Sequence, residues 1–142
     1  MIVVDTNVFV AALRSRTGVS RKLARAIFEG RIEIGASPAL FLEYEAVLSR
    51  TDQRAAFELS LTEVRAFLDA LALVTAPIAL NFLWRPQLQD PADEMVLEAA
   101  VNGLAADLVT WNVRHFKAAA SRFGLRVTPP NLYWAKISKE PR

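Results

Sequence analysis

The chain has no cysteine and only one histidine among its 142 residues. It therefore has no disulfide framework, which suits a cytosolic protein. No apolar run approaches the ~20 residues that a membrane-spanning helix needs. The N-terminus has no basic region and carries a carboxylate at Asp5, so it does not read as a signal peptide. These absences predict a soluble, cytoplasmic protein.

Apolar residues, by contrast, are abundant. They make up 53% of the chain, and the mean hydropathy is +0.22. This length and composition allow one domain to bury a sizeable core. Because no repeat, low-complexity stretch or linker divides the sequence, we expect a single domain over residues 1–142.

Short apolar runs alternate with helical patterns along the chain. We expect strands at residues 2–4, 32–36, 108–110 and 125–127. We expect helices at residues 8–13, 20–29, 38–49, 61–71, 91–102 and 130–137. This order predicts an α/β fold, a three-layer α/β/α sandwich with a central parallel sheet.

Several helix ends carry recognisable capping residues. Ser37 and Asp90 each precede a proline, as an N-cap before Pro at the first helical position. Ser60 and Glu63 have the spacing of a capping box. Gly30 is placed to close the helix before it.

Polar side chains follow two of the expected strands. Asp5 comes directly after the first, and Thr110, Trp111 and Asn112 come at the end of another. Ligands of parallel α/β sheets bind beyond the carboxyl ends of the strands, so these residues are placed for a site. The alternative is that Asp5, with the two residues after it, only turns the chain and caps a helix.

Glu43 lies beside an apolar helical stripe that includes Leu40, Tyr44 and Val47. A carboxylate at that position must be paired, protonated or bound to a metal, because burying a lone charge is costly. An ion pair with an arginine is the alternative. Glu45 falls on the outer face, where we expect it to be solvated.

Asp90 and Asp93 suit the start of a helix, where acids are favourable. Asp93 also shares a helical face with Leu97, which points it toward the sheet edge; Glu94 is expected to point elsewhere, into solvent. With no cysteine and one histidine, a cluster of carboxylates favours Mg²⁺ or Mn²⁺.

Charge is distributed unevenly along the chain. Residues 51–112 carry three Lys/Arg and nine Asp/Glu, whereas residues 113–142 carry seven and one. A basic segment beside an acidic one suggests a polyanionic partner, although an ordinary solvated surface is the alternative. The basic residues of the last segment are Arg114, Lys117, Arg122, Arg126, Lys136, Lys139 and Arg142.

Taken in order, these motifs resemble the PIN domain family over about residues 1–130. They are Asp5-Thr6-Asn7 after a strand, Glu43 after Ser-Pro, Asp90-Pro-x-Asp93, Leu108-Val-Thr-x-Asn112 and the following Arg114-His115-Phe116. The resemblance is strongest to the branch of VapC-like toxins of toxin–antitoxin pairs.

The resemblance implies a metal-dependent endoribonuclease that cuts single-stranded RNA, inhibited by a small antitoxin and often dimeric. The catalytic residues it implies are Asp5, Glu43 and Asp93. The implied ligands of Mg²⁺ or Mn²⁺ are these three and Asp90. The residues implied to support them are Thr6, Asn7, Thr110 and Asn112. We expect the RNA to contact Arg14, Arg16, Trp111 and Arg114, with base stacking on Trp111 unless that residue belongs to the core or a lid.

Asn112 departs from the family pattern, because many PIN nucleases have an aspartate there. An amide adds no negative charge, so a second metal would be held weakly or not at all. A catalytically silent PIN-like module that binds RNA or protein is therefore the alternative. A receiver domain is disfavoured, because it would need paired acids after its first strand and an aspartate at a central strand end. An aspartate-nucleophile phosphatase is disfavoured, because Asn7 stands where Asp-x-Asp needs its second acid. We expect His115 to be a surface or capping residue, since the sequence offers it no carboxylate partner.

Overall fold

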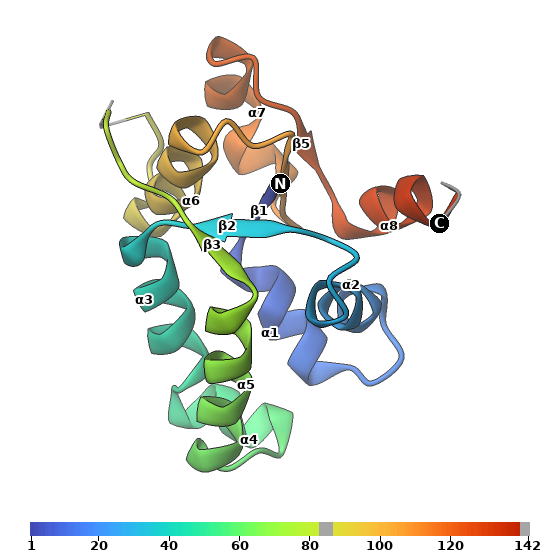
Figure 1. Ribbon diagram of the computed structural model, residues 1–142. Coiled ribbons are helices and arrows are strands. Elements are labelled where there is room, and N and C mark those ends of the chain that lie inside the picture. Colours follow the sequence, from blue (N-terminus) through green and yellow to red (C-terminus); the bar gives the residue numbers. More distant parts are fainter. Residues whose placement is uncertain (83–86, 140–142) are drawn as a thin grey trace.

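The computed structural model describes residues 1–82 and 87–139 and contains one parallel sheet, shown in Figure 1. Five strands lie in the order β3-β2-β1-β4-β5. All their pairings are parallel. The strands are β1 (Ile2–Val4), β2 (Ile34–Ala36), β3 (Thr75–Pro77), β4 (Asp107–Val109) and β5 (Val127–Thr128).

Eight helices in the described ranges connect and cover the strands. They are α1 (Thr6–Arg14), α2 (Val19–Phe28), α3 (Pro38–Leu48), α4 (Thr51–Phe57), α5 (Leu61–Leu73), α6 (Pro91–Asn102), α7 (Val113–Arg122) and α8 (Pro130–Ser138). Helices α6 and α7 lie on one side of the sheet, and α1 and α2 on the other, where α8 packs against α2 (Figure 1). The three-layer α/β/α fold is thus confirmed. None of these helices is both long and apolar enough to cross a membrane.

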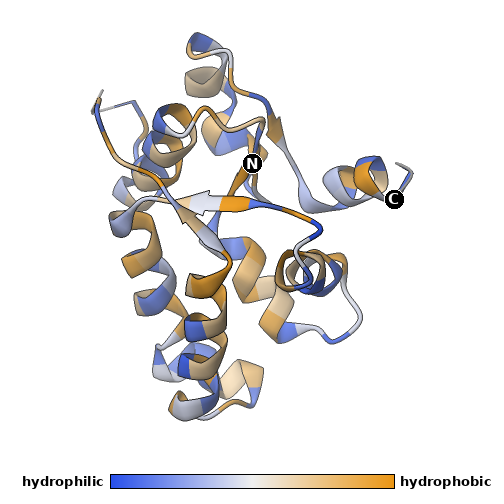
Figure 2. Cartoon of the chain, viewed as in Figure 1, coloured by the Kyte–Doolittle hydropathy of each residue, from blue (hydrophilic) through white to orange (hydrophobic). Residues whose placement is uncertain are grey.

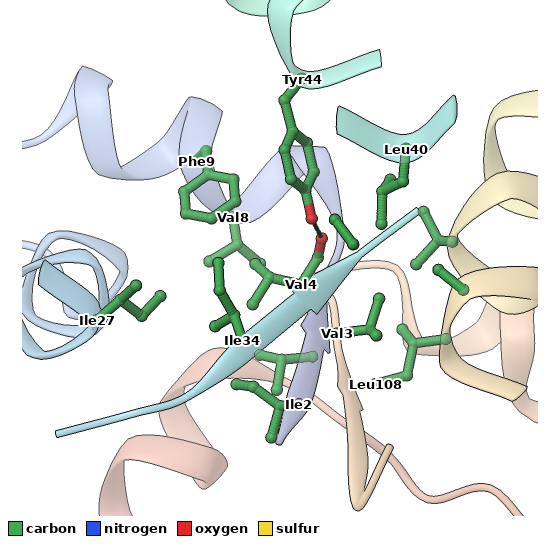
Figure 3. Packing of buried hydrophobic residues seen from close by; sticks show 14 of the residues in the cluster. Ile2, Val3, Val4, Val8, Phe9, Ile27, Ile34, Leu40, Tyr44 and Leu108 are labelled. Atoms are coloured by element: carbon green, nitrogen blue, oxygen red, sulfur yellow. Dashed lines mark hydrogen bonds between the residues drawn. The ribbon is translucent and has the colours of Figure 1, made fainter. Parts of the chain in front are cut away.

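The core forms where apolar strands meet the inner faces of the helices. Every residue of β1 and β2 is buried, as expected for strands covered on both faces. Helices such as α3 and α5 carry alternating hydrophobic and hydrophilic bands (Figure 2). Figure 3 shows Phe9 and Tyr44 above the sheet, with the Tyr44 hydroxyl donating a hydrogen bond to the Val4 carbonyl oxygen. That bond ties α3 to the end of β1.

The capping predictions are confirmed. The hydroxyl oxygen of Ser37 accepts a hydrogen bond from the Leu40 N–H, at 3.1 Å. Ser60 and Glu63 form both bonds of a capping box. Asp90 Oδ1 accepts a hydrogen bond from a backbone N–H in the first turn of α6. Gly30 has φ 77°, a left-handed conformation that favours glycine at a helix end.

Three elements were not predicted: α4, β3 and α7. Strand β3 is short, half-exposed and ends in Pro77, so it lacks a buried apolar run. Helix α7 begins without a side-chain cap and is rich in charged residues, so its start is poorly marked. The remaining strands and helices lie within a few residues of their predicted bounds.

Candidate active site

Asp5 lies just beyond β1, at the carboxyl edge of the sheet. It is buried, with 7% of its surface exposed to solvent. Its Oδ2 accepts a hydrogen bond of 2.7 Å from the Thr110 hydroxyl, which follows the neighbouring strand β4. Burial raises the pKa of Asp5 to about 6, against a lowering effect of the Thr110 bond, and the charge of Asp93 raises it further. The two carboxylates are therefore close enough to interact electrostatically.

Thr110 is the centre of the hydrogen-bond network around Asp5. Its Oγ1 accepts bonds from the Asn112 backbone N–H (2.9 Å) and from Asn7 Nδ2 (3.3 Å). Asn7 Oδ1 in turn accepts a bond from the Trp111 N–H. Because two N–H groups occupy the Thr110 oxygen, its own proton is directed at Asp5. The network fixes the orientation of the carboxylate.

Thr6 and Asn112 were both predicted to support the metal ligands, and they act on the site through their backbone N–H groups. Thr6 Oγ1 is buried and has no hydrogen-bond partner within the described residues; its backbone N–H, like that of Asn7, lowers the pKa of Asp5. Asn112 is exposed and is the N-cap of α7, but its side chain makes no capping bond. Asn112 thus acts on Thr110 through its backbone.

Asp93, in the first turn of α6, is 8% exposed. Burial raises its pKa, a bond to His115 lowers it, and the charge of Asp90 raises it. His115 Nδ1 lies 3.1 Å from Asp93 Oδ2. His115 is exposed, as predicted for a surface residue, but the expectation that it has no carboxylate partner is wrong. Its partner comes from a different helix, and sequence spacing alone gives no sign of that pairing.

Glu43 is half-buried on α3, and its neighbour Glu45 is exposed as expected. Tyr44, beside Glu43, has a raised pKa, mainly from burial and also from the charge of Asp5, so this part of α3 faces Asp5. No described residue forms an ion pair with Glu43. Within residues 1–82 and 87–139, however, no three Asp, Glu or His side chains already form a group that would hold a metal ion. The metal ligands remain predictions.

Asp90 and Glu94 occupy opposite environments at the start of α6. Asp90 is exposed and caps the helix. Glu94, expected in solvent, is only 4% exposed, so that expectation is wrong. Its Oε1 accepts hydrogen bonds from the backbone N–H groups of Gln87 (2.5 Å) and Leu88 (2.7 Å). The segment before α6 folds over Glu94. A helical wheel of α6 alone does not contain that segment, so it could not predict the burial of Glu94.

A cavity of about 400 Å³ opens beside Asp93, between the start of α6 and α7. Asp90 and Asp93 lie on one wall, and Arg114, His115 and Arg122 on the other. Arg122 donates a hydrogen bond of 2.6 Å to Gln87 Oε1. Arg122 was predicted only as a member of the basic C-terminal segment, and Gln87 was not predicted, since neither belongs to a motif.

The other residues predicted to bind RNA are exposed to solvent. Arg14, at the end of α1, is exposed and donates to Gln53 Oε1 at 2.8 Å, and Arg16 is exposed in the following loop. Trp111 is 41% exposed, and its Nε1 donates to the Ser20 hydroxyl at 3.0 Å. One edge of the Trp111 ring is thus fixed while part of its surface faces solvent. RNA contact by these residues stays a prediction.

Part of the basic C-terminal segment serves the fold instead. Arg126 Nε and Lys136 Nζ lie 3.1 and 3.7 Å from the carboxylate oxygens of Asp107, at the start of β4. Asp107 is 2% exposed and also accepts a bond from the Thr128 hydroxyl. Its position within an apolar strand was the available signal for a paired buried acid. Arg142 lies outside the described residues.

A protein-family model with the description "PIN domain" matches residues 1–114. Among curated proteins and solved structures, none matches the chain at a significant level. The family match covers most of the chain and includes Asp5, Glu43, Asp90, Asp93 and Thr110, and the parallel sheet agrees with it. The chain therefore belongs to the PIN domain family, a family of nuclease-type domains.

Proposed function

We propose that this protein is a Mg²⁺- or Mn²⁺-dependent endoribonuclease that cuts single-stranded RNA. The observation that carries the proposal is the juxtaposition of Asp5 and Asp93, two buried acids from different elements whose pKa values are raised by burial. Neither makes an ion pair with a Lys or Arg in the described residues. A buried carboxylate is costly unless its charge is compensated. His115 compensates Asp93 only when its imidazole is protonated, whereas a divalent ion would compensate both acids.

The donor set fits a hard divalent ion. Asp5 and Asp93 would hold it directly, while Glu43 on α3 and Asp90 at the helix start would add oxygen ligands, directly or through water. A bound divalent ion would activate water and offset charge on the phosphate during phosphodiester hydrolysis. Thr110 keeps the Asp5 carboxylate oriented, and His115 does the same for Asp93. Arg14, Arg16 and Arg114 would attract the RNA backbone, and Trp111 offers a ring for base stacking.

The biological role that we propose is that of a VapC-like cytoplasmic toxin, dimeric and inhibited by a small antitoxin protein. This part is supported by the sequence from Leu108 to Phe116, which resembles that branch of the family. Induced expression should arrest cell growth, and co-expression of a short protein encoded next to the gene should relieve the arrest. Growth unaffected by the active protein would exclude the toxin role while leaving the nuclease activity intact.

The activity is tested with a labelled single-stranded RNA, with Mn²⁺ or Mg²⁺ and with EDTA. We expect slow internal cleavage that needs the metal. Asp5→Asn, Asp93→Asn and Glu43→Gln should each reduce the rate by at least about 100-fold, the size of effect seen when one group that stabilises a transition state is removed. Glu45→Gln is the matched control, since Glu45 is exposed on the same helix.

Two outcomes would overturn the proposal. If the wild type binds RNA but never cleaves it with either metal, the protein is a silent binding module, as Asn112 suggested. If Glu45→Gln lowers the rate as much as Glu43→Gln, the acids act through overall charge and do not form a site. A single-stranded DNA of the same sequence tests the choice of RNA.

A further inference from the structure

The cavity between α6 and α7 has features that metal binding does not explain. One wall carries Arg114 and Arg122, which line it from the first and last turns of α7. Residues 114, 118 and 122 are spaced four apart, so they follow one line along the helix, and Ala118 leaves the space between the two arginines open. This line of α7 therefore presents two cations to one cavity.

Both guanidinium groups keep their charge available. Arg122 is exposed, and it donates a hydrogen bond to the uncharged side-chain oxygen of Gln87, 2.6 Å away. Arg114 is exposed and makes no hydrogen bond or ion pair with another described residue. A neutral partner fixes a guanidinium without neutralising it, and a guanidinium has five N–H donors to share.

The cavity wall that holds Arg122 is itself fixed from α6. Glu94 accepts bonds from the backbone N–H groups of Gln87 and Leu88, and the Gln87 side chain then accepts from Arg122. A buried acid of α6 thereby positions a cation of α7 across the cavity. Holding a donor in place before the ligand arrives reduces the ordering cost of binding.

We propose that Arg122, held by Gln87, forms together with Arg114 a phosphate-binding subsite for a phosphodiester group of single-stranded RNA, separate from the one that is cut. Residue 122 lies roughly 10 Å along the helix from His115, which is bonded to Asp93. The RNA would leave the acidic site along α7, with its backbone facing the arginines. This subsite rests on the proposed ribonuclease function for its substrate.

Lys117 supplies a matched control. It is an exposed cation of the same helix but lines a different hollow, together with Leu125 and Leu132. General attraction of RNA to a basic helix would involve Lys117 as much as Arg122. If the subsite exists, RNA binding should depend on Arg122 and Gln87 and should not depend on Lys117.

The test is equilibrium binding of a fluorescent single-stranded RNA in EDTA, where no cleavage occurs, at several salt concentrations. Arg122→Gln should weaken binding about 3- to 10-fold and lower the salt slope by about 0.7, the contribution of one phosphate contact. Gln87→Glu should weaken binding similarly, because it keeps Arg122 in place but neutralises it. Arg122→Lys should keep most of the slope, and Lys117→Gln should bind as the wild type does.

The results separate the subsite from the ribonuclease function. Equal losses in Lys117→Gln and Arg122→Gln, or no loss in Arg122→Gln and Gln87→Glu, would overturn the subsite even if the wild type cleaves RNA with Mn²⁺. A selective loss in Arg122→Gln would support the subsite even if no metal gives cleavage, in which case the nuclease proposal alone fails. Equal binding of a short acidic peptide, lost in the same variants, would show an acidic protein segment to be the occupant.

Discussion

Each end of the central sheet buries an aspartate, but only one of the two aspartates is paired with Lys and Arg side chains of the described residues. Strands β1 and β4 are neighbours, with Ile2 beside Asp107 and Val4 beside Val109, so Asp107 and Asp5 lie at opposite ends of the pair. Each accepts a hydrogen bond of 2.7 Å from a threonine hydroxyl. Asp107 also meets Arg126 and Lys136, whereas the charge that acts on Asp5 is that of another acid, Asp93.

This difference separates a residue that holds the fold from one that is kept for binding. A buried carboxylate with cations and a hydroxyl around it is compensated within the protein. A buried carboxylate beside a second acid has a raised pKa, and a cation from outside would relieve that cost. The amino ends of the strands thus secure β5 and α8, while the carboxyl ends form the candidate active site.

The largest effect on stability should come from the compensated end. Asp107→Asn keeps an acceptor for Thr128 but loses both ion pairs, and we expect the free energy of unfolding to fall by about 2–3 kcal/mol. Urea unfolding at pH 7.5 in EDTA measures it. Asp69→Asn is the control, because Asp69 is exposed on α5. Equal stability of the two variants would show that Asp107 is not an anchor. RNA binding and cleavage by folded Asp107→Asn should stay close to wild type.

Removing the shared hydroxyl at the other end should cost less stability but change the site. In Thr110→Val, Asp5 loses its donor and two N–H groups lose their acceptor, for an expected loss of about 1–2 kcal/mol. Since the Thr110 bond lowers the pKa of Asp5, that pKa should rise above its value of about 6. NMR titration of the Asp5 carboxyl carbon measures the shift. Thr110→Ser should restore the pKa, and an unchanged value in Thr110→Val would contradict the network.

Features that depend on a single element could be predicted from the sequence. The first strand was predictable because Ile2, Val3 and Val4 are uniformly apolar and a polar residue follows them. The position of Asp5 at the sheet edge came from the same pattern. Asp93 was placed toward that edge by helical periodicity, which depends only on one element.

Features that depend on two elements were not predictable. The bond between His115 and Asp93 joins α7 to α6, and Glu94 is buried by a segment that precedes its own helix. The cations that pair with Asp107 are Arg126, just before β5, and Lys136, on α8. For His115 and Glu94 the local pattern is compatible with a solvated residue, and only the packing of the second element decides the outcome. For Asp107 the apolar strand indicates burial, but the cations that pair with it come from other elements.

Asp5→Asn should raise the free energy of unfolding, by an amount smaller than the two losses above. The folded-state pKa of about 6 exceeds the ordinary 3.8, so the folded protein holds this proton more tightly than the unfolded chain does. This tighter proton binding stabilises the folded protein fully below pH ~3.8, and the stabilisation is lost as the pH rises through about 6. Once Asp5 is fully ionised, the loss amounts to ~3 kcal/mol. The amide avoids this cost but adds a donor where backbone N–H groups point, so we expect a net gain of about 1 kcal/mol at pH 7.5.

Urea unfolding between pH 4 and 7.5 in EDTA tests that gain. The decline in wild-type stability between pH 4 and 6 should be reduced in Asp5→Asn. Mn²⁺ should stabilise the wild type more at pH 7.5 than at pH 5, because the ion competes with the proton for Asp5, and should stabilise Asp5→Asn little. A variant with the full wild-type pH dependence would place the raised pKa on another group.

The smallest change in stability, and the sharpest test of the metal site, is Asn112→Asp. The side chain of Asn112 is exposed at the start of α7 and makes no capping bond, so an acid there should add only about 0.3–1 kcal/mol, through the helix dipole. Asn131→Asp is a matched control, since Asn131 is exposed in the first turn of α8. Both variants should gain similar stability without metal. Only Asn112→Asp should change a calorimetric Mn²⁺ titration, from one strong site toward two, because its charge would join those of Asp5 and Asp93. Identical titrations of the two variants would place residue 112 outside the metal site, and the weak second site could then no longer be attributed to the asparagine.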